Sequence, residues 1–521
     1  MSERARPAMR LAWKLLPWVV IAIAILFRVL ELGRLPGING DEAWYGVQAQ
    51  RWASGEMVDW RTPSGNLPGP LQLGGLLLLQ AVFEPSFALL RVPSLIASLG
   101  AMAMAYAIGR RFFDRTTAMI ALLLMAALPV NIAYARFGWD TSHLGLVILA
   151  AAYAALAGRR VLSALAFGLS VTVHPTAVFA GPFLALLVFG REMETVPLRP
   201  AIARLLPYLA MLILASGLLA ITTSGGQALA SFSGLGDRLT APAQWAAFGI
   251  LFERLMTGET VYRYITGQGF GRLTPSIDLA GAVLIMGLAA SAIITLRRRA
   301  FGIAAGVVTG WLLSLLLFFL IAGNGALQPH FERYALWLIA PTSLAVAVLV
   351  RRLVRRDNVA ITITLAITIL LLAGFWLRYF VVLETQGSLS SRTFWTGPAE
   401  PKQAAHDQLA AVARAEGPIR VVAEDWWLFW PVRYLAGGEP IKMRNAESLP
   451  PRPDRIAQRE EIYWLVYTGS ALDRQIAATA DARLRSAIDA TGHPQALHIW
   501  WTPAKPTSPR AQEQPSAPAR R

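Results

Sequence analysis

Two adjacent carboxylates, Asp41 and Glu42, follow directly after the apolar run "LLPWVVIAIAILFRVL". A carboxylate can act as a general base that takes the proton of an attacking hydroxyl, provided it lies within hydrogen-bond reach. An acid pair next to an apolar segment is most often simply solvated. The pair therefore indicates chemistry only if other reactive groups come to the same place.

Three other stretches supply such groups. Arginines and aromatic residues near membrane surfaces are often only interfacial anchors, and a histidine beside a proline often only caps a helix. Here, however, acids, arginines and histidines recur at the ends of several apolar runs, where we expect them at one depth. The residues are Tyr45 and Arg61 near the acid pair, Tyr134, Arg136, Trp139 and Asp140 in "NIAYARFGWDTSH", His174 in "VHPT", and His330, Arg333 and Tyr334 in "QPHFERY".

The composition places these groups in a membrane protein. Of the 521 residues, 55% are hydrophobic and 15% charged, against about 25% charged in typical soluble proteins. Several apolar runs reach the roughly 18 residues that indicate a spanning helix, and their continuity excludes a barrel. The net charge of +16 comes largely from arginines in short loops, so it predicts no nucleic-acid partner. The absence of cysteine fits an extracytoplasmic protein of a bacterium.

We predict a polytopic α-helical protein with about eleven transmembrane helices. The predicted spans are Leu11–Leu30, Phe87–Ile108, Thr117–Ala133, Leu144–Ala157, Val161–Val173, Thr176–Phe189, Leu205–Thr222, Leu279–Leu296, Gly302–Ala322, Tyr334–Val350 and Ile361–Val382.

Arginines in alternate loops predict the orientation. The basic N-terminus and the segments 109–115, 158–160, 191–204, 297–299 and 351–357 are rich in arginine, which is typical of cytoplasmic loops. We therefore expect a multi-pass protein of the bacterial inner membrane with a cytoplasmic N-terminus. The acid pair, the long loops 31–86 and 223–278, and everything after residue 383 would lie outside.

The outer segments predict three further features. Helical spacing from Ala43 to Ala53 indicates an amphipathic helix at the membrane surface, and "NLPGPLQLGGLLLLQAVF" is a second candidate. Residues 384–501 predict a small extracytoplasmic α/β domain, with a helix in "QAAHDQLAAVARAEG" and strands in "IRVVAED" and "EIYWLVYTG". Residues 502–521 are rich in proline and alanine and predict a disordered tail.

The motifs on the predicted outer face resemble those of the GT-C glycosyltransferases. Within this superfamily the motifs resemble those of the branch that contains the protein O-mannosyltransferases and the lipid A aminoarabinose transferases. In that family an Asp-Glu pair follows the first span, an acid follows the third span in a "YaR…D" context, and an "H…RY" element lies near the last spans. "GDEAWYGVQAQRWASG", "NIAYARFGWDTS" and "QPHFERY" occur here in that order.

The resemblance implies an inverting transfer of a sugar from a polyprenyl-phosphate carrier to a lipid, glycan or protein acceptor, within a domain of residues 1–383. Asp41 would be the base, with Glu42 and Asp140 orienting the acceptor or the loop. Arg136 and Arg333 would hold the departing phosphate, together with His330 and Arg61. Tyr45, Tyr134, Trp139, His174 and Tyr334 would contact the substrates.

The aminoarabinose branch carries an acid and a lysine before a proline in its first loop, where this chain has "NLPGP". This departure argues against aminoarabinose as the sugar and against a metal site, and we expect no cofactor. Other classes remain possible from the sequence: a transporter or flippase, a non-catalytic glycan-assembly protein, or a polymerase or ligase of related chemistry.

Overall fold

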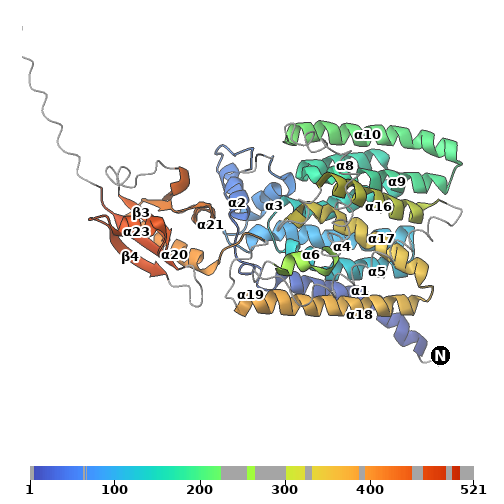
Figure 1. Ribbon diagram of the computed structural model, residues 1–521, viewed down its shortest axis with the longest axis horizontal. Helices are drawn as coiled ribbons and strands as arrows, with labels where there is room; N and C mark the ends of the chain where they lie inside the picture. The colour runs from blue at the N-terminus through green and yellow to red at the C-terminus, as the bar shows by residue number, and fades with distance from the viewer. Residues whose placement is uncertain are drawn as a thin grey trace, which may run out of the picture.

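The computed structural model describes residues 5–62, 65, 67–224, 255–263, 301–322, 331–385, 394–448, 461–488 and 496–504. A bundle of long helices runs along one axis, and a smaller unit built on a β-sheet extends from one end of it (Figure 1). The N-terminus lies at the opposite end of the bundle. This arrangement agrees with the predicted helical chain and small C-terminal α/β unit.

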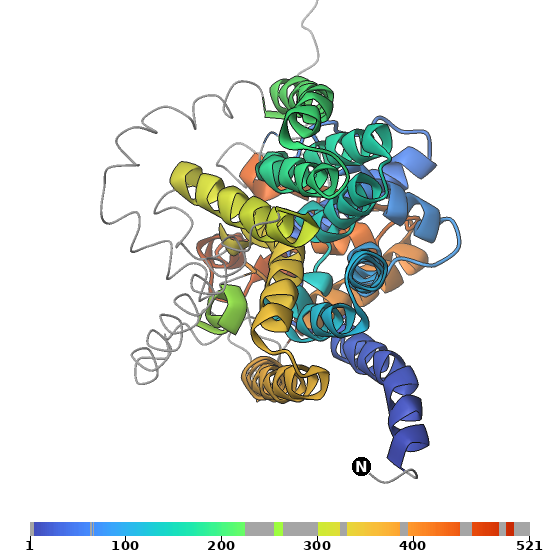
Figure 2. The same cartoon turned by 90° about the vertical axis from the view of Figure 1, so that its right-hand side faces the viewer.

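One continuous hydrophobic core joins the bundle helices. Helix α17 is almost wholly buried in it, whereas α10 and α18 are mostly exposed and lie on opposite sides of the bundle (Figure 2). The helices are α1 (Ala5–Val29), α4 (Val92–Phe112), α5 (Arg115–Ala127), α6 (Pro129–Ala135), α7 (Leu144–Leu156), α8 (Arg160–Val173), α9 (Gly181–Met193), α10 (Leu198–Ser224), α14 (Glu259–Arg263), α16 (Ile303–Ala322), α17 (Leu336–Leu353), α18 (Asp357–Phe375) and α19 (Val382–Thr385).

Six helices within the described residues are long and apolar enough to cross a membrane, or seven if the bent pair α5–α6 counts as one span. The prediction of about eleven spans is therefore not confirmed. Helix α8 has 14 residues, which extend about 21 Å, less than the roughly 30 Å of a hydrocarbon core. Apolar run length alone does not separate such short helices from full spans. The predicted span Leu279–Leu296 lies outside the described residues.

Four of the predicted arginine-rich turns lie within the described residues, and they gather at one end of the bundle. Two ion-pair clusters join them, and Arg111 Nη1 at the end of α4 connects the clusters by donating to Tyr153 Oη near the end of α7, at 2.7 Å. The fifth turn, 297–299, lies outside the described residues. The pairs are Arg351 with Asp114 (3.1 Å) and Asp357 (3.0 Å), and Arg160 and Arg204 with Glu192 (2.5 and 3.1 Å).

Pro129 bends the chain by 60° between α5 and α6. Proline has no N–H, so the carbonyl of Met125 loses its helical donor. Asn131 Nδ2 donates to that carbonyl at 2.6 Å, and the buried Arg28 of α1 donates to it at 3.1 Å and to Ala126 O at 3.3 Å. The bend thereby directs α6 and the following loop, which contains Asp140, across the end of the bundle.

Two short helices cover the end of the bundle from which the sheet unit projects. Helix α2 (Gly40–Ala53) contains the predicted interfacial segment 43–53, and α3 (Pro70–Gln80) forms the second predicted segment. The buried face of α2, including Trp44 and Val47, packs on Leu73 and Leu76 of α3. The prediction of two helices in this loop agrees with the structure.

A five-stranded sheet forms the C-terminal unit, in the order β2-β1-β3-β5-β4. Strands β2, β1 and β3 are parallel, and β5 and β4 pair antiparallel beyond β3. Separate hydrophobic clusters cover its two faces. The elements are α20 (Glu400–Glu416), β1 (Ile419–Ala423), α21 (Trp426–Leu435), β2 (Ile441–Asn445), β3 (Ile462–Tyr467), α23 (Ala471–Ala477), β4 (Arg483–Ile488) and β5 (Leu497–Thr502). Residues 505–521 of the predicted tail lie outside the described residues, and the predicted division at residue 383 stays a prediction.

Helix α21 of this unit packs across α2. A Cβ at Gly40 would overlap the ring of Trp426, and one at Gly46 would overlap the ring of Tyr434, so both glycines permit the close approach. Gln50 Nε2 donates to Tyr434 O at 2.9 Å. Helix α2 is therefore held between the bundle and the C-terminal unit by contacts from Gly40 to Gln50.

Candidate functional site

A small cavity of about 90 Å³ lies at the junction of α2, the loop after α6 and the start of α17. It brings together seven of the residues that the sequence predicts for the site: Asp41, Tyr45, Trp139, Asp140, His174, Arg333 and Tyr334. Trp44, Thr62 and Thr141 complete its described wall.

Asp41 lies in the first turn of α2. Asn39 caps this helix, with its Oδ1 accepting from Asp41 N at 2.6 Å. Burial raises the pKa of the Asp41 carboxyl, Arg333 lowers it, and the negative charges of Asp140 and Glu42 raise it, with a net upward shift. A carboxylate with a raised pKa is a stronger base, which suits proton removal from a hydroxyl.

Asp140 begins a 3₁₀ turn (Asp140–His143) before α7 and faces the same cavity. Its Oδ1 accepts from Thr141 N at 2.7 Å, and its Oδ2 accepts from Tyr45 Oη at 3.4 Å. Burial raises the pKa of Asp140 to about 6, although Thr141 N–H and Arg333 act in the opposite direction. Two carboxyl groups with raised pKa values thus share one cavity, a feature typical of functional sites.

Arg333 is the cation of this cavity and belongs to a 3₁₀ turn (Phe331–Ala335) before α17. Its guanidinium lies over the rings of Trp139 and Tyr334, 4.7 and 4.9 Å from their centroids, and its Nη2 donates to Tyr334 Oη at 2.9 Å. Among the described residues no acid approaches it within ion-pair distance, and its buried Nε has no hydrogen-bond partner. The aromatic rings therefore hold a guanidinium whose donors remain available to an anion.

Tyr45 and His174 also line the cavity. Tyr45 Oη also accepts from Gly69 N at 2.9 Å, which ties α2 to the start of α3. The ring of His174 lies 5.4 Å from that of Tyr334. Burial and the nearby Arg333 lower the pKa of His174 to about 3, so the ring is neutral at pH 7.

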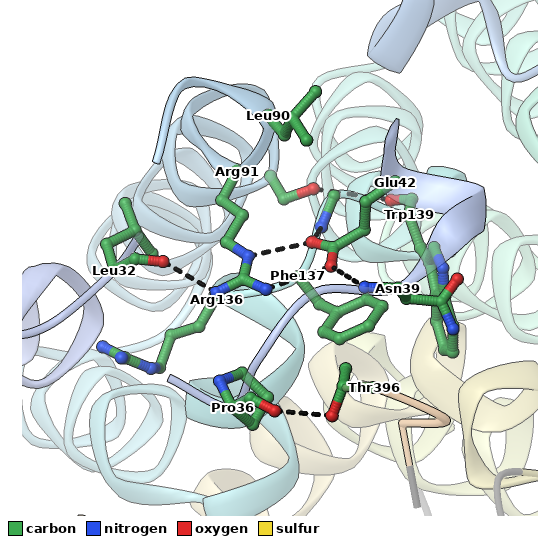
Figure 3. Close-up of polar contacts among 12 residues, drawn as sticks. Leu32, Pro36, Asn39, Glu42, Leu90, Arg91, Arg136, Phe137, Trp139 and Thr396 are labelled. Carbon is green, nitrogen blue, oxygen red and sulfur yellow. Dashed lines mark hydrogen bonds and ion pairs between the residues drawn. The ribbon is translucent and has the colours of Figure 1, made fainter. Parts of the chain in front are cut away.

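Glu42 follows Asp41 in sequence but points away from the cavity into a buried hub (Figure 3). Its carboxylate accepts from Arg91 Nε and Nη2 at 2.9 and 3.0 Å, from Gly138 N at 2.7 Å, and from Asn39 N at 3.3 Å. Both side chains of the Glu42–Arg91 pair are fully buried. Glu42 therefore fixes the start of α2 to the loop after α6, which contains Gly138 and leads to Asp140. Glu42 does not line the cavity, and its expected role in orienting the acceptor or the loop stays a prediction.

Three other sequence-predicted residues within the described part of the chain do not line this cavity. Arg136 is fully buried beside the hub, donating to Phe27 O at 3.0 Å and lying 4.8 Å from the ring centroid of Phe380. Its expected role at the donor phosphate stays a prediction. Arg61 is exposed and donates to Gly65 O at 2.9 Å. Tyr134 is buried behind Trp139, with ring centroids 5.9 Å apart. His330 lies outside the described residues.

Sequence reasoning missed Arg91, which is the hub's cation. It lies in the apolar stretch "FALLRVPS", where an arginine resembles a membrane-surface anchor. Its guanidinium also donates to Leu32 O at 2.7 Å, to Leu35 O at 2.8 Å and to Gly37 O. A charged residue this deep within an apolar run was the available signal, because such a position needs an internal partner.

Within the described part of the chain, no group of three or more acids and histidines is arranged to hold a metal ion. The expectation that the protein needs no metal stays a prediction.

The chain is similar to known proteins in structure. No family model and no curated protein matches its sequence. The structure of ArnT from Cupriavidus metallidurans bound to undecaprenyl phosphate overlays with a TM-score of 0.55 at 14% identity, covering 92% of this chain and 97% of that one. Looser overlays are found with ArnT in the apo state (TM-score 0.43, 14% identity, covering 92% and 97%) and with the archaeal oligosaccharyltransferase AglB from Archaeoglobus fulgidus in complex with an inhibitory peptide and a dolichol-phosphate (TM-score 0.46, 14% identity, covering 82% and 64%).

The first of these overlays shows that the chain shares the fold of ArnT, a GT-C protein. The resemblance predicted from the motifs is thereby confirmed at the level of the fold. At 14% identity the structural similarity shows the fold and does not identify the substrate of this chain.

Proposed function

We propose that the protein is an inverting glycosyltransferase that moves a sugar from a polyprenyl-phosphate carrier to a hydroxyl of an extracytoplasmic acceptor. The observation that carries this proposal is the cavity in which Asp41 and Asp140 face Arg333. The shared fold adds support, because the ArnT structure that overlays on this chain holds undecaprenyl phosphate.

In the proposed reaction Asp41 takes the proton of the acceptor hydroxyl as its oxygen attacks the anomeric carbon. The new C–O bond forms on one face of the sugar while the bond to the phosphate oxygen breaks on the other, which inverts the anomeric centre. The electron pair leaves with the lipid phosphate. The sugar phosphoester already has a good leaving group, so the enzyme mainly supplies a base, orientation and positive charge.

Arg333 is the proposed partner of the departing phosphate. Its unpaired donors and the neighbouring Tyr334 lie on the same wall of the cavity. Asp140 and Tyr45 are proposed to orient the acceptor or the sugar. Burial and the nearby Asp140 raise the pKa of Tyr45 well above its ordinary value, so its hydroxyl keeps its proton and can donate.

The proposed location is the bacterial inner membrane, with the N-terminus inside and the C-terminal unit outside. The four described arginine-rich turns lie together at one end of the bundle. Helix α2, whose first turn lines the cavity, and the sheet unit lie at the other end (Figure 1). A reporter fused after Gly397 should be active only outside the cytoplasm. Cytoplasmic activity of that fusion would reverse the orientation and contradict an outer-face reaction.

The direct test is a transfer assay on detergent-solubilised protein. Lipids that copurify are identified by mass spectrometry, and the lipid-linked sugar found is radiolabelled and incubated with membrane extract as acceptor. We expect a polyprenyl-phosphate sugar and a labelled product, both dependent on an intact Arg333. A transporter would move the lipid-linked sugar across a vesicle membrane without forming product. A non-catalytic assembly protein would bind the lipid and lose nothing when Asp41 is replaced.

A further inference from the structure

A second and larger cavity, of about 760 Å³, lies between the C-terminal half of α2, the end of α3 and the C-terminal unit. Its volume falls within the roughly 300–1,000 Å³ typical of small-molecule sites, which often lie between structural units. The wall includes Gln50, Arg51 and Phe83 on one side, and Arg433, Gly438 and Lys442 on the other. None of these residues belongs to the cavity of Asp41.

The charges around this cavity leave two cations without an acidic partner, although the guanidinium of Arg433 lies 5.6 Å from the ring centroid of Phe429. Arg51 pairs with Asp59 at 2.9 Å and with Glu56 at 3.7 Å, and Glu439 pairs with Arg414 at 3.6 Å. Arg433 and Lys442 line the cavity, and no acid in the described part of the chain lies within ion-pair distance of either. Two unneutralised cations on one wall favour an anionic group in the space between the two units.

The rest of the wall suits a polyhydroxylated ligand. Gln50 and Gln80 each donate one amide N–H to a backbone carbonyl, Tyr434 O at 2.9 Å and Gly46 O at 3.3 Å, so a ligand could use the second N–H and the oxygen of each amide. Ser54 adds a hydroxyl, and Phe83 presents a ring with 55% of its surface exposed. Sugar rings have one polar edge and apolar C–H faces, which match amides and an aromatic ring respectively. A bare phosphate ion would fill only a small part of this volume.

Helix α2 connects the two cavities. Asp41 in its first turn lines the small cavity, and Arg51 near its end lines the large one. Ten residues of helix separate them by about 15 Å. An oligosaccharide seated in the large cavity could therefore bring a hydroxyl of a neighbouring sugar to Asp41, while the donor phosphate lies at Arg333.

We propose that the large cavity is the acceptor subsite, and that the acceptor is a saccharide carrying a carboxylate or phosphate. This inference rests on the proposed function, because it names the acceptor class of that reaction. Arg433 and Lys442 bind the anionic substituent, and the amides and Phe83 bind the sugar. Burial and the nearby Arg51 lower the pKa of Arg433, whereas Glu56 and Asp59 raise it, with a net downward shift.

The test measures binding to the full-length detergent-solubilised protein by saturation-transfer NMR. The three probes are a disaccharide containing glucuronic acid, its neutral analogue with the same linkage, and inorganic phosphate. The variant is Arg433→Gln/Lys442→Gln, with Lys442→Gln alone as a milder form. The matched control is Arg444→Gln/Arg474→Gln, which removes two cations of the same unit that do not line the cavity.

We expect the acidic disaccharide to bind the wild type and the matched control alike, and about tenfold more weakly to the double variant, as for loss of charge-assisted hydrogen bonds at a partly exposed site. Lys442→Gln alone should show part of that loss. Arg333→Ala, which alters the other cavity, should leave this binding unchanged. Equal binding of the acidic disaccharide to the double variant overturns the proposal. Phosphate that binds as tightly as the acidic disaccharide, or a neutral analogue that binds equally well, also overturns it.

A transfer assay separates this inference from the proposed function. With an acidic glycan as acceptor, the double variant should raise the acceptor KM about tenfold, with kcat and undecaprenyl-phosphate binding unchanged. Transfer that proceeds with an unchanged acceptor KM would overturn the subsite and leave the enzyme proposal standing. Absence of any transfer by the wild type would overturn the enzyme proposal, while the binding result would still decide whether the saccharide site exists.

Discussion

Asp41 and Glu42 are adjacent in sequence, yet each belongs to a different acid–arginine group. Glu42 and Arg91 are fully buried, joined by two hydrogen bonds, and saturated by further backbone partners. Asp41 lies on a cavity wall with Asp140, and Arg333 faces both without an ion pair. Successive residues of a helix point about 100° apart, so one step along α2 separates the two environments.

The two groups differ in whether their hydrogen-bonding capacity is already used within the protein. A saturated pair has no donor or acceptor left for a ligand, and its geometry fixes the backbone on both sides. An unsaturated group keeps hydrogen-bond donors that a substrate can occupy, and its carboxyls have raised pKa values. We therefore propose that Glu42 and Arg91 position the backbone, and that Asp41, Asp140 and Arg333 carry the chemistry.

The largest effect on stability should come from Arg91→Ala, which leaves Glu42 buried and unpaired. Breaking a buried ion pair in this way typically costs about 3–5 kcal/mol. We expect a large fall in the thermal unfolding midpoint of the detergent-solubilised protein. Arg110→Ala, at the exposed far end of helix α4, which begins directly after Arg91, is the matched control and should unfold like the wild type. An Arg91→Ala protein as stable as this control would refute the structural role of the hub.

Arg333→Ala should have an intermediate effect, on donor binding and with little change in stability. Loss of a charged hydrogen bond typically costs about 1.5–3 kcal/mol, so undecaprenyl phosphate should bind roughly tenfold to a hundredfold more weakly. Arg61→Ala removes an exposed arginine from the same end of the molecule and should bind the lipid normally. If both variants bound equally well, Arg333 would not be the phosphate partner.

The smallest effect should be a dependence of stability on pH that Asp140 introduces. Its pKa of about 6 lies above the ordinary value of 3.8, so the native state retains a proton that the unfolded chain has lost. The associated stability is full below about 3.8 and is lost as the pH rises through about 6. Asp140→Asn should therefore unfold at a higher temperature, relative to the wild type, at pH 8 than at pH 4. A difference that does not vary with pH would contradict the raised pKa.

The sequence predicted much of the fold and of the cavity because motifs at the ends of apolar runs share one depth. Asp41, Asp140, Arg333 and Tyr334 come together as expected. The separation of Asp41 from Glu42 could not be predicted, because it depends on which neighbours lie on each side of α2.

Tertiary packing also decided the features that the sequence did not reveal. Arg136 turns toward the backbone of α1 and the ring of Phe380, away from the cavity. Arg91 gained its role only through Glu42, which lies 49 positions away in sequence. An apolar run as short as α8 can form either a transmembrane span or a shorter helix within the bundle. Hydropathy does not distinguish these two cases, so it could not predict the number of spans.

The most direct test of the account compares Asp41→Asn with Glu42→Gln in one preparation, measuring sugar transfer and thermal unfolding for each. Both changes keep the side-chain shape and remove one charge from adjacent residues. We predict that Asp41→Asn folds and binds donor like the wild type but transfers sugar about 10²–10⁴-fold more slowly, the usual contribution of a general base. Glu42→Gln should instead lower the unfolding midpoint. An Asp41→Asn protein that transfers sugar at the full rate would contradict the assignment of Asp41 as the base.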